Sequence, residues 1–342
     1  MDDLQLSQII DARARVRDEA RPDAVAAVHA MGRLTARERI GELVDAGTFV
    51  EYGPLAGATP DVGDDVHADG LVAGVGRVGG GPTLIASYDT TVRDGTQTDR
   101  NMRKLVRLLY LANRHRWPFV CFVDGDGARP GTDRLPPPVV VYSRGTWDVY
   151  EGLAELSGWA PSVAVVSGRA LDGNAGLAML CDCVIATEGS ELGSRAGDGS
   201  VVTQPVEELA ADGSIDVIVA DERQAIGTVA DYLAYWGDGF SDSGPAPDHA
   251  RIASLIPDDR RGPYDVRRVM AALADADSLL ELGAGWAPSM ITALATLGGR
   301  PIGIFANQPQ SPVAGAIDSA AADKAARFVE LCDAYELALV SL

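Results

Sequence analysis

The sequence predicts an α/β protein in which buried parallel strands alternate with helices, built from two copies of one design. First, short apolar runs at 119–123, 162–167 and 183–187 alternate with helical patterns, as expected for strands buried on both faces. Second, 38 glycines and only 6% aromatic residues favour many tight turns. Third, the pattern starts again late in the chain. Because 342 residues exceed the usual size of one core, we expect domains at 1–240 and 241–342.

The N-terminal region is expected to be helical. Residues 4–30 contain alanine, valine and charged residues without a glycine, and they predict one helix. Thr35 and Glu38 fit a capping box, so a short helix should begin there and end at residues 45–47. Residues 61–69 are polar and indicate a surface loop.

The strands are expected from residue 70 onward. Residues 71–78 and 83–88 lie on either side of a glycine-rich turn and predict a hairpin, and residues 101–116 have a helical period. The other elements that we expect are helix 142–156, strand 162–167, helix 175–179, strand 183–187, linker 237–250, helix 266–276, hairpin 293–306, helix 320–337 and a buried strand at 337–342.

The composition excludes several classes of function. A net charge of −20 argues against nucleic acid as a partner, although local positive charge can still bind an anionic ligand. No stretch is apolar enough to span a bilayer and the first residues are acidic, so we expect no membrane association and a cytoplasmic protein. Residue spacing indicates no metal site. The cysteines should be buried free thiols: Cys121, Cys181, Cys183 and Cys332.

Two turns are candidates for carrying chemistry because each follows a buried strand, where open α/β sheets bind ligands. They are residues 124–129 and residues 168–174. Their small residues leave backbone amides accessible, and two amides that point at one oxygen form an oxyanion hole. A CoA thioester whose carbonyl becomes an enolate needs that arrangement. The ordinary alternative for each turn alone is a connection between strand and helix.

The second turn resembles a turn of the crotonase superfamily, in residues 166–173 (VSGRALDG) and 177–182 (LAMLCD). The resemblance implies a crotonase-like fold of ββα repeats, with a complete N-terminal domain and an incomplete second copy. It also implies that Gly173 supplies one backbone donor and that Ala128, or Gly127, supplies the other. Gly176 stands where crotonase hydratases place a catalytic carboxylate, which argues against hydratase chemistry.

A narrower resemblance is to the β-type carboxyltransferases of biotin-dependent acyl-CoA carboxylases, of the propionyl-CoA or acetyl-CoA type. It is carried by residues 26–40 (AAVHAMGRLTARERI) and 45–51 (DAGTFVE). Further matches lie in the second segment, at 263–265 (PYD), 299–301 (GRP), 306–309 (ANQP), 323–329 (DKAARFV) and 332–333 (CD).

This resemblance implies a division of labour between two domains. The N-terminal domain binds the acyl-CoA, and the C-terminal domain binds carboxybiotin, which a biotin carboxylase and biotin carrier partner supplies. The family forms hexamers, so we expect a homo- or hetero-oligomer. The enolate of the acyl-CoA attacks CO2 from carboxybiotin, and no metal is needed. Family members continue past the last strand into further glycine-rich turns, so we expect this chain to be truncated or completed by another chain.

The turns depart from the family pattern at three aspartates. Gly-Gly pairs are usual in place of Asp172-Gly173 and Asp126-Gly127, and Gly-Gly-Ser is usual in place of Asp94-Gly95-Thr96. If Asp172 pointed at an enolate, the repulsion would be about 4 kcal/mol at an effective dielectric constant near 20. That would cancel one good oxyanion donor. Pointing into solvent, or capping the following helix, would cost little.

Several residues are candidates for binding the substrate. The resemblance places part of the CoA-binding surface in the N-terminal signature, and the glycine-rich turn at Gly95 and Thr96 is a further candidate. Arginines beside the turns could contact CoA phosphates, although surface arginines without a ligand are more common. The candidates among the arginines are Arg33, Arg37, Arg39, Arg129 and Arg169.

Three functions therefore remain open. The first is an active carboxyltransferase component that carboxylates a short acyl-CoA. The second is a catalytically impaired acyl-CoA-binding or assembly subunit of the same family, which the aspartates favour. The third is a hydratase or hydrolase, which lacks an acid or base side chain at Gly176.

Overall fold

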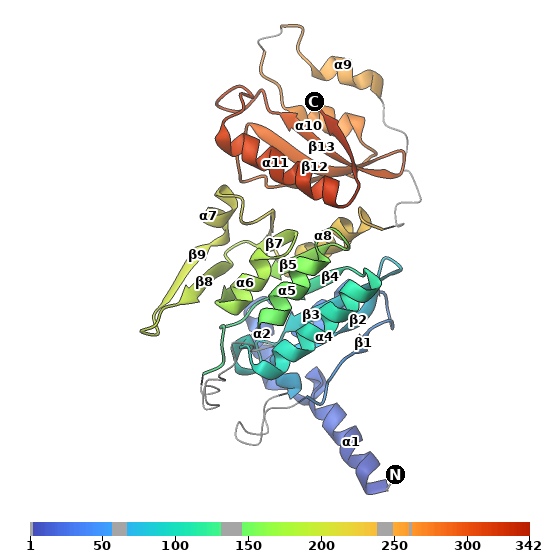
Figure 1. The fold of residues 1–342 in the computed structure, drawn as a ribbon, viewed down its shortest axis with the longest axis vertical. Coiled ribbons are helices and arrows are strands. Elements are labelled where there is room, and N and C mark those ends of the chain that lie inside the picture. The colour runs from blue at the N-terminus through green and yellow to red at the C-terminus, as the bar shows by residue number, and fades with distance from the viewer. Residues whose placement is uncertain (1–2, 57–66, 131–145, 238–248, 260–261) are drawn as a thin grey trace. The chain divides into compact units, whose positions relative to one another are not determined.

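A computed structural model describes residues 3–56, 67–130, 146–237, 249–259 and 262–342, which form two compact units (Figure 1). Unit 1 consists of Met1–Pro205 and Val219–Gly227, and unit 2 of Val206–Ile218 and Thr228–Leu342. The domain boundary expected at 240/241 stays a prediction, and the linker at 237–250 lies mostly outside the described residues.

The N-terminal helix expected over residues 4–30 is wrong, because it is interrupted. Helix α1 (Asp3–Arg15) ends, a short 3-10 turn η1 (Asp18–Ala20) follows, and α2 (Pro22–Ala30) begins after it. Arg21 stands between them with φ −132° and ψ 51°, outside the helical region. The interruption has a local cause, since Pro22 has no amide to donate and restricts the residue before it.

The capping box is confirmed. The Glu38 amide donates to Thr35 Oγ1 at 3.1 Å, and the Thr35 amide donates to Glu38 Oε2 at 2.8 Å. These reciprocal bonds open α3 (Ala36–Leu43), whose residues Ile40 and Leu43 are buried. A second capping box, between Thr98 and Asn101, opens α4 (Asp99–His115) two residues earlier than the apolar period indicated.

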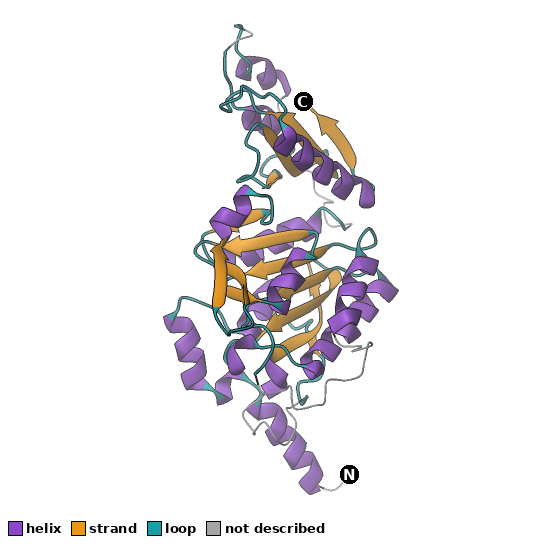
Figure 2. Ribbon diagram, turned by 60° about the vertical axis from the view of Figure 1, so that its left-hand side comes forward, coloured by secondary structure: helices purple, strands orange, loops and turns teal. Residues whose placement is uncertain are grey.

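Unit 1 contains the first six strands of a seven-stranded sheet of order β1-β2-β3-β4-β5-β7-β10. Strands β1 to β3 pair antiparallel, and β3, β4, β5 and β7 pair parallel, as expected from their apolar runs. Helices lie along both sides of these strands (Figure 2). The bounds are β1 (Val50–Glu51), β2 (Leu71–Val78), β3 (Gly81–Tyr88), β4 (Phe119–Phe122), β5 (Ser162–Val166), β7 (Cys183–Thr187) and β10 (Val217–Val219).

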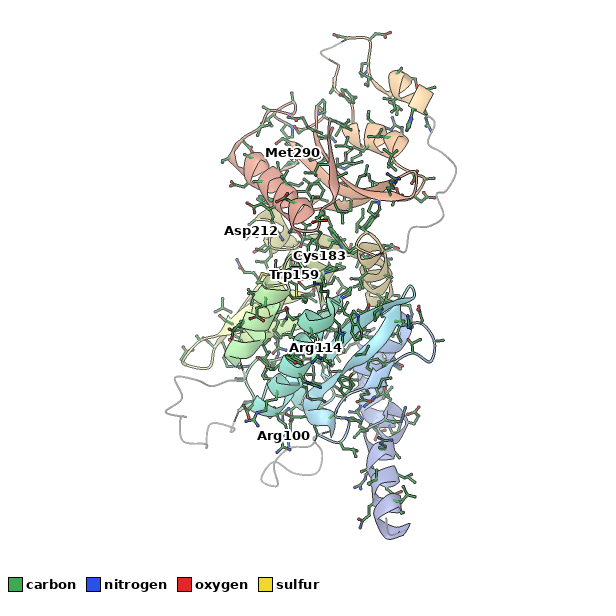
Figure 3. The ribbon with its side chains drawn as sticks, turned by 45° about the vertical axis from the view of Figure 1, so that its right-hand side comes forward. Arg100, Arg114, Trp159, Cys183, Asp212 and Met290 are labelled. Carbon is green, nitrogen blue, oxygen red and sulfur yellow. The ribbon has the colours of Figure 1, made fainter. Side chains whose placement is uncertain are left out.

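The core of unit 1 is the parallel part of this sheet. Every residue of β4, β5 and β7 is buried. Helix α4 packs against β2 and β3 and against α5 (Thr146–Leu156), part of whose expected range, 142–145, lies outside the described residues. The four cysteines are buried and free, as expected. Figure 3 labels Cys183, inside β7, and the exposed Arg114 on α4.

A small second sheet in unit 1 was not expected. It has the order β6-β8-β9, with β6 (Arg169–Leu171), β8 (Glu191–Arg195) and β9 (Val201–Pro205). These strands are short and carry mostly exposed or polar side chains, so they have no clear apolar period. β6 leads through Asp172 into α6 (Gly173–Met179) and therefore fixes the second turn.

Unit 2 contains a four-stranded sheet of order β11-β12-β13-β14. Its hairpin β12 (Met290–Leu297) and β13 (Arg300–Asn307) is confirmed, and its core includes Met270 of α10 (Val266–Leu273). The last strand, β14 (Ala338–Ser341), pairs parallel with β13 but is largely exposed, so its expected burial is wrong. The side chains are exposed because, among the described elements, little besides α11 (Ser319–Ala334) packs against the faces of β14.

The remaining elements complete the described chain. Its helices are each too short or too polar to cross a lipid bilayer. The bounds are η3 (His67–Gly70), η4 (Arg93–Gly95), α7 (Val206–Ala211), α8 (Glu222–Ala234), η5 (His249–Arg251), α9 (Ile252–Leu255), β11 (Leu280–Leu282) and α11 (Ser319–Ala334).

Candidate active site

Three turns of unit 1 are joined by backbone hydrogen bonds. The Gly125 amide donates to Arg169 O and the Leu171 amide donates to Gly125 O, both at 2.9 Å. On the other side, the Gln97 amide donates to Gly127 O at 2.7 Å and the Arg129 amide to Gln97 O at 2.9 Å. The turn at 124–129 is therefore held between the turn at 94–97 and the turn at 169–173. The sequence predicted each turn, but not that they join.

Asn174 is the side chain that holds the three turns together. It is fully buried, and its Nδ2 donates to Val123 O at 3.0 Å and to Gly95 O at 3.5 Å. Its Oδ1 accepts from the Gly127 amide at 3.2 Å. A side-chain amide at this place thus serves one backbone group from each neighbouring turn. Asn174 follows a glycine at the start of a helix, and that was the signal that could have identified it.

In these turns, the amides of Ala128 and Gly173 are among those that donate to no protein group of the described residues. Ala128 is exposed and Gly173 is half-buried, so solutes can reach this part of the surface. The alternative donor, Gly127, has its amide bound to Asn174. Of the two candidates in the first turn, Ala128 is therefore the one with a free donor.

A buried ion cluster fixes the bases of both turns. Asp124, 1% exposed, accepts the amides of Ser167 and Gly168 at Oδ1, each at 2.9 Å. Its Oδ2 lies 2.7 Å from Arg39 Nη2, which also lies 2.5 Å from Glu222 Oε1. Arg39 was expected to contact CoA, but it is 2% exposed and is ion-paired with the carboxylates of Asp124 and Glu222. Its place in the structure is to neutralise the charge of Asp124.

Asp172 does not cap the following helix, and no side-chain cap hydrogen bond is present at α6. Its Oδ1 accepts from the Arg195 amide at 2.8 Å, while Oδ2 lies so close to Gly127 that a Cβ there would overlap it. Its backbone has φ 50° and ψ −118°, a conformation that favours glycine and strains other residues. The carboxylate therefore lies against the first turn.

The second aspartate, Asp126, has its charge neutralised locally. Arg169 donates to Asp126 Oδ1 from Nη2 at 2.7 Å and from Nε at 3.1 Å, and Arg195 Nη2 lies 3.7 Å from Oδ2. All three side chains are partly exposed. Arg169 was expected to be a candidate phosphate contact, and it lies at the surface beside both turns with Asp126 as its ion-pair partner.

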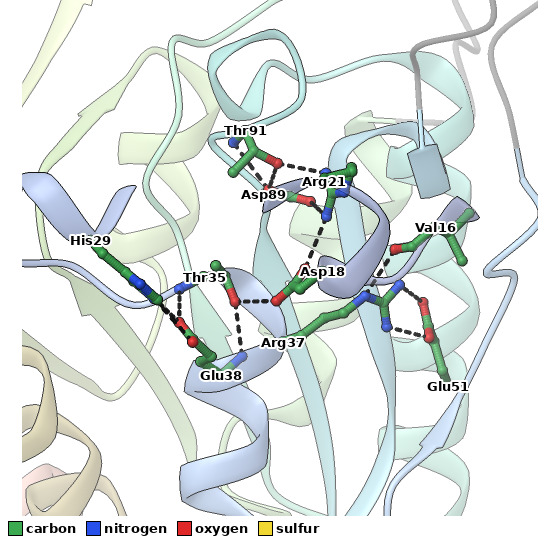
Figure 4. A network of polar contacts seen from close by, with 10 residues as sticks. All are labelled: Val16, Asp18, Arg21, His29, Thr35, Arg37, Glu38, Glu51, Asp89 and Thr91. Carbon is green, nitrogen blue, oxygen red and sulfur yellow. Dashed lines mark hydrogen bonds and ion pairs between the residues drawn. The ribbon is translucent and has the colours of Figure 1, made fainter. Parts of the chain in front are cut away.

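Arg129 and Arg37 are held inside the protein. Arg129 is 5% exposed and binds Asp69 Oδ1 at 2.5 Å and Thr96 Oγ1 at 3.0 Å. Arg37 donates to both carboxylate oxygens of Glu51, at 2.6 and 2.9 Å, within the polar network of Figure 4. The guanidinium donors of both residues are thus largely used by the fold.

Arg33 differs from the other candidate arginines. Its guanidinium lies against Gly168, so that a Cβ on that glycine would overlap it. Its side chain is half-buried and has no hydrogen bond or ion pair with another described residue, while its backbone amide donates to Val28 O at 3.2 Å. Arg33 is therefore a cation held over the second turn without a carboxylate partner.

The candidate residues Gly95 and Thr96 are buried. The Gly95 amide donates to Val92 O at 3.2 Å, and the Thr96 amide and hydroxyl both donate to Arg93 O. Within the described residues, no group of His, Cys, Asp and Glu could hold a metal ion.

A surface pocket of about 650 Å³ lies beside η1, α2 and α3, in the N-terminal signature. Charges of both signs line it, which gives it no clear preference for an anion. Its lining residues are Arg17, Asp18, Glu19, Pro22, Val25, Ala26, His29, Arg37 and Glu38.

Comparisons with known proteins agree on one family. The family model described as the carboxyl transferase domain matches residues 27–342. The biotin-dependent acetyl-/propionyl-coenzyme A carboxylase beta5 subunit of Mycobacterium tuberculosis is 32% identical over 94% of this chain and 63% of its own length.

Two solved structures are also similar. A single-chain, multi-domain long-chain acyl-CoA carboxylase has 37% identity and a TM-score of 0.90, covering 99% of this chain and 36% of that one. The transcarboxylase 12S hexamer with hydrolysed methylmalonyl-CoA has 29% identity and a TM-score of 0.85, covering 98% of this chain and 68% of that one. The chain spans 63% of the length of the first curated relatives that it matches.

Proposed function

Because this chain belongs to the carboxyl transferase domain family, we propose that it binds a short acyl-CoA, such as propionyl-CoA or acetyl-CoA, for carboxylation at its α-carbon. The observation that carries the proposal is the pair of free amides, at Ala128 and Gly173, on two turns that are bonded directly to each other. Such donors suit one thioester oxygen.

In this site the two amides would stabilise the oxygen of the enolate. Loss of an α-proton moves negative charge onto the thioester oxygen, and fixed donors stabilise that charge without rearranging. One such donor lowers the activation barrier by about 3 kcal/mol. Rigidity is therefore as important as the donors. It is supplied by Asn174 and by the Asp124–Arg39 ion pair, both of which are buried.

Arg33 is the residue that we assign to the anionic part of CoA. It lies against the second turn and carries no carboxylate partner among the described residues, whereas Arg37, Arg39 and Arg129 are paired with acidic side chains. A guanidinium is well suited to phosphate because its planar donors match two oxygens. Arg169 is the second choice, since a phosphate would have to compete with Asp126.

The carboxyl group that the enolate receives would come from carboxybiotin on a partner carrier protein. One pair of free amides accommodates one carbonyl oxygen, and we assign it to the thioester. The proposal includes a biotin carboxylase and a biotin carrier as partners and a homo- or hetero-oligomer as the working state, because relatives are named as subunits and one similar structure is a hexamer.

A second candidate is an acyl-CoA-binding or assembly subunit without turnover. It is favoured by Asp172, whose carboxylate lies against Gly127 and so brings a negative charge close to the place where the enolate would form. The Asp172→Asn variant separates the two candidates, because it removes the charge and keeps the shape. A large gain in turnover would identify the wild-type carboxylate as inhibitory.

The test combines binding and turnover. Calorimetry should show that propionyl-CoA binds to the chain and that Arg33→Met weakens binding roughly tenfold, the order expected for a charge-assisted hydrogen bond. Labelled bicarbonate should enter propionyl-CoA when a biotin carboxylase and biotinylated carrier are added. Binding without label incorporation would support the second candidate, and absence of binding would exclude both.

A further inference from the structure

Gln97 is placed between the two free amides but has no part in the function proposed above. Its backbone forms the bridge to the first turn: its amide donates to Gly127 O, and its carbonyl accepts from the Arg129 amide. Its side chain reaches the second turn, where a Cβ on Gly173 would overlap Oε1. Gln97 therefore contacts the chain beside Ala128 with its backbone and Gly173 with its carboxamide.

The other end of the carboxamide is held by Tyr88. Gln97 Nε2 donates to Tyr88 Oη at 3.0 Å, and that hydroxyl contacts Met102 Sδ at 3.7 Å. Tyr88 is 0% exposed, and burial raises its pKa well above the usual value, so it remains a neutral hydroxyl. A neutral hydroxyl can donate or accept. It can therefore serve either end of the Gln97 carboxamide.

The two orientations of the carboxamide have opposite effects on an oxyanion. With Oε1 towards Gly173, an acceptor lies beside the free donors. After a half-turn about the last side-chain torsion, Tyr88 donates to Oε1 and Nε2 faces Gly173. The Tyr88 hydroxyl then donates to the Gln97 carboxamide oxygen in place of the Met102 sulfur. A carboxamide oxygen is a better hydrogen-bond acceptor than a thioether sulfur.

We propose that Gln97 is a third, side-chain donor to the thioester oxygen and that Tyr88 is the positioning residue that holds its carboxamide in the donating orientation. This inference rests on the proposed function, because it takes the oxygen to lie at Ala128 and Gly173. Gln97 is 9% exposed, so its hydrogen bond would be formed largely out of water.

The experiment compares propionyl-CoA with S-propyl-CoA, a thioether that lacks the carbonyl oxygen. The ratio of their affinities isolates the carbonyl contacts from the rest of CoA. Calorimetry on the full chain should show that Gln97→Met, which keeps length and shape, lowers the wild-type preference for the thioester about threefold to tenfold. Affinity for the thioether should stay within about twofold of wild type. Gln204→Met, at an exposed glutamine on β9, is the matched control.

Two further variants test the donating orientation. Gln97→Glu keeps the shape but presents only acceptors, so it should lower the preference at least as much as Gln97→Met. Tyr88→Phe removes the hydroxyl that holds the carboxamide and should also lower the preference, by less than Gln97→Met. If Gln97→Met does not fold, Tyr88→Phe carries the test.

The outcomes distinguish this inference from the proposed function. If both ligands bind and Gln97→Met keeps the wild-type preference, the Gln97 donor is excluded while the acyl-CoA site stands. If neither ligand binds to the wild-type chain, the proposed function fails and this inference fails with it. A preference that falls in Gln97→Met and Gln97→Glu but not in Gln204→Met supports the third donor.

Discussion

Residues 35–122 of unit 1 and residues 265–341 of unit 2 are built in the same way. Each begins with a capped helix, α3 or α10, continues through a short strand into an antiparallel hairpin, and returns through a helix to a strand that pairs parallel with the hairpin. We call these segments the first and the second repeat. The second was expected from the sequence as a restart of the pattern.

The repeats share their polar contacts as well as their topology. Arg37 and Glu51 form a bidentate ion pair in the first repeat, and Arg267 and Glu281 form one in the second. A lysine on the long helix donates to backbone carbonyls in both repeats: the half-buried Lys104 to two and the buried Lys324 to three. The bonds of these lysines are to Ala68 O and Leu71 O for Lys104, and to Gly283 O, Trp286 O and Met290 O for Lys324.

The repeats differ at the core-facing position of the first helix. In the first repeat this is Arg39, paired with Asp124 and Glu222, and in the second it is Val269, which packs in an apolar cluster. Each lies four residues after the N-cap of its helix, Thr35 or Asp265. Asp124 belongs to the turn after β4. The comparison teaches that the scaffold needs no charge at this position of the first helix, and that the turns of the candidate site do.

The largest expected effect is that of Arg39→Val, which gives the first repeat the residue of the second. It leaves two carboxylates buried without a cation and should lower the free energy of unfolding of unit 1 by about 3–5 kcal/mol. Hydrogen exchange measured on peptides from each unit checks this. Val269→Leu in unit 2 is the apolar control, with an effect of about 1–3 kcal/mol from the added methylene group. Equal effects of the two substitutions would contradict the comparison.

The lysines Lys104 and Lys324 give the next largest effect. Lys324→Met leaves three carbonyls without their donor and Lys104→Met leaves two, so we expect losses of about 3 and about 2 kcal/mol in their own units. Hydrogen exchange by unit again reports the loss. A larger effect of Lys104→Met than of Lys324→Met would be inconsistent with the carbonyl count.

The same lysines predict a dependence on pH. Burial lowers the pKa of Lys104 and of Lys324 to about 8, below the value of about 10.4 in an unfolded chain. Between these values the unfolded state binds the proton more tightly, so stability due to each lysine rises as pH increases from about 8 to about 10. The difference in unfolding free energy between the wild type and each Lys→Met variant should therefore rise with pH over this range. A difference that does not change with pH would show that the lysine keeps an ordinary pKa. Urea unfolding at pH 7.5 and 9.5 measures this difference.

The bidentate ion pairs should differ in strength because their exposure differs. Side chains of Arg37 and Glu51 are 17% and 16% exposed, and those of Arg267 and Glu281 are 36% and 18% exposed. Double-mutant cycles to Met and Gln should give a coupling of about 1–2 kcal/mol for the first pair and below about 1 kcal/mol for the second. The reverse order would show that burial does not set the difference.

The smallest effect concerns the loop after the first helix of each repeat. Gly47 has φ 74°, and Asp277, two residues after Asp275 as Gly47 is after Asp45, has φ 57°. Asp277→Gly should stabilise unit 2 by a few tenths to about 1 kcal/mol, because glycine adopts positive φ without steric cost. Gly47→Asp should destabilise unit 1 by a similar amount. Thermal melting detects both, and a loss of stability in Asp277→Gly would contradict the argument.

Much of the fold was predictable because its strands are buried on both faces and its helices carry caps. The hairpins, the parallel strands and the Thr35 capping box follow from local patterns, and the family resemblance is confirmed by the match over residues 27–342. The β6-β8-β9 sheet was missed because its strands have no apolar period.

The turns of the candidate site were predictable from the sequence, but the contacts that join them were not. Glycines and strand ends mark Ala128 and Gly173. However, the partners of Asn174, Asp124 and Arg39 depend on contacts between residues far apart in the chain, which a sequence pattern does not encode. For the same reason, Arg39 and Arg129 looked like surface cations in the sequence and are buried in the structure.

The most direct measurement of the central claim is the infrared carbonyl frequency of propionyl-CoA labelled with ¹³C at the thioester carbon. If the amides of Ala128 and Gly173 both bind its oxygen, the frequency should fall below its value in water when the ligand binds. It should return towards the water value in Ala128→Pro, which removes one amide hydrogen, and stay low in Ala128→Ser, which keeps it. A bound carbonyl with the water frequency in the wild-type chain would contradict the account.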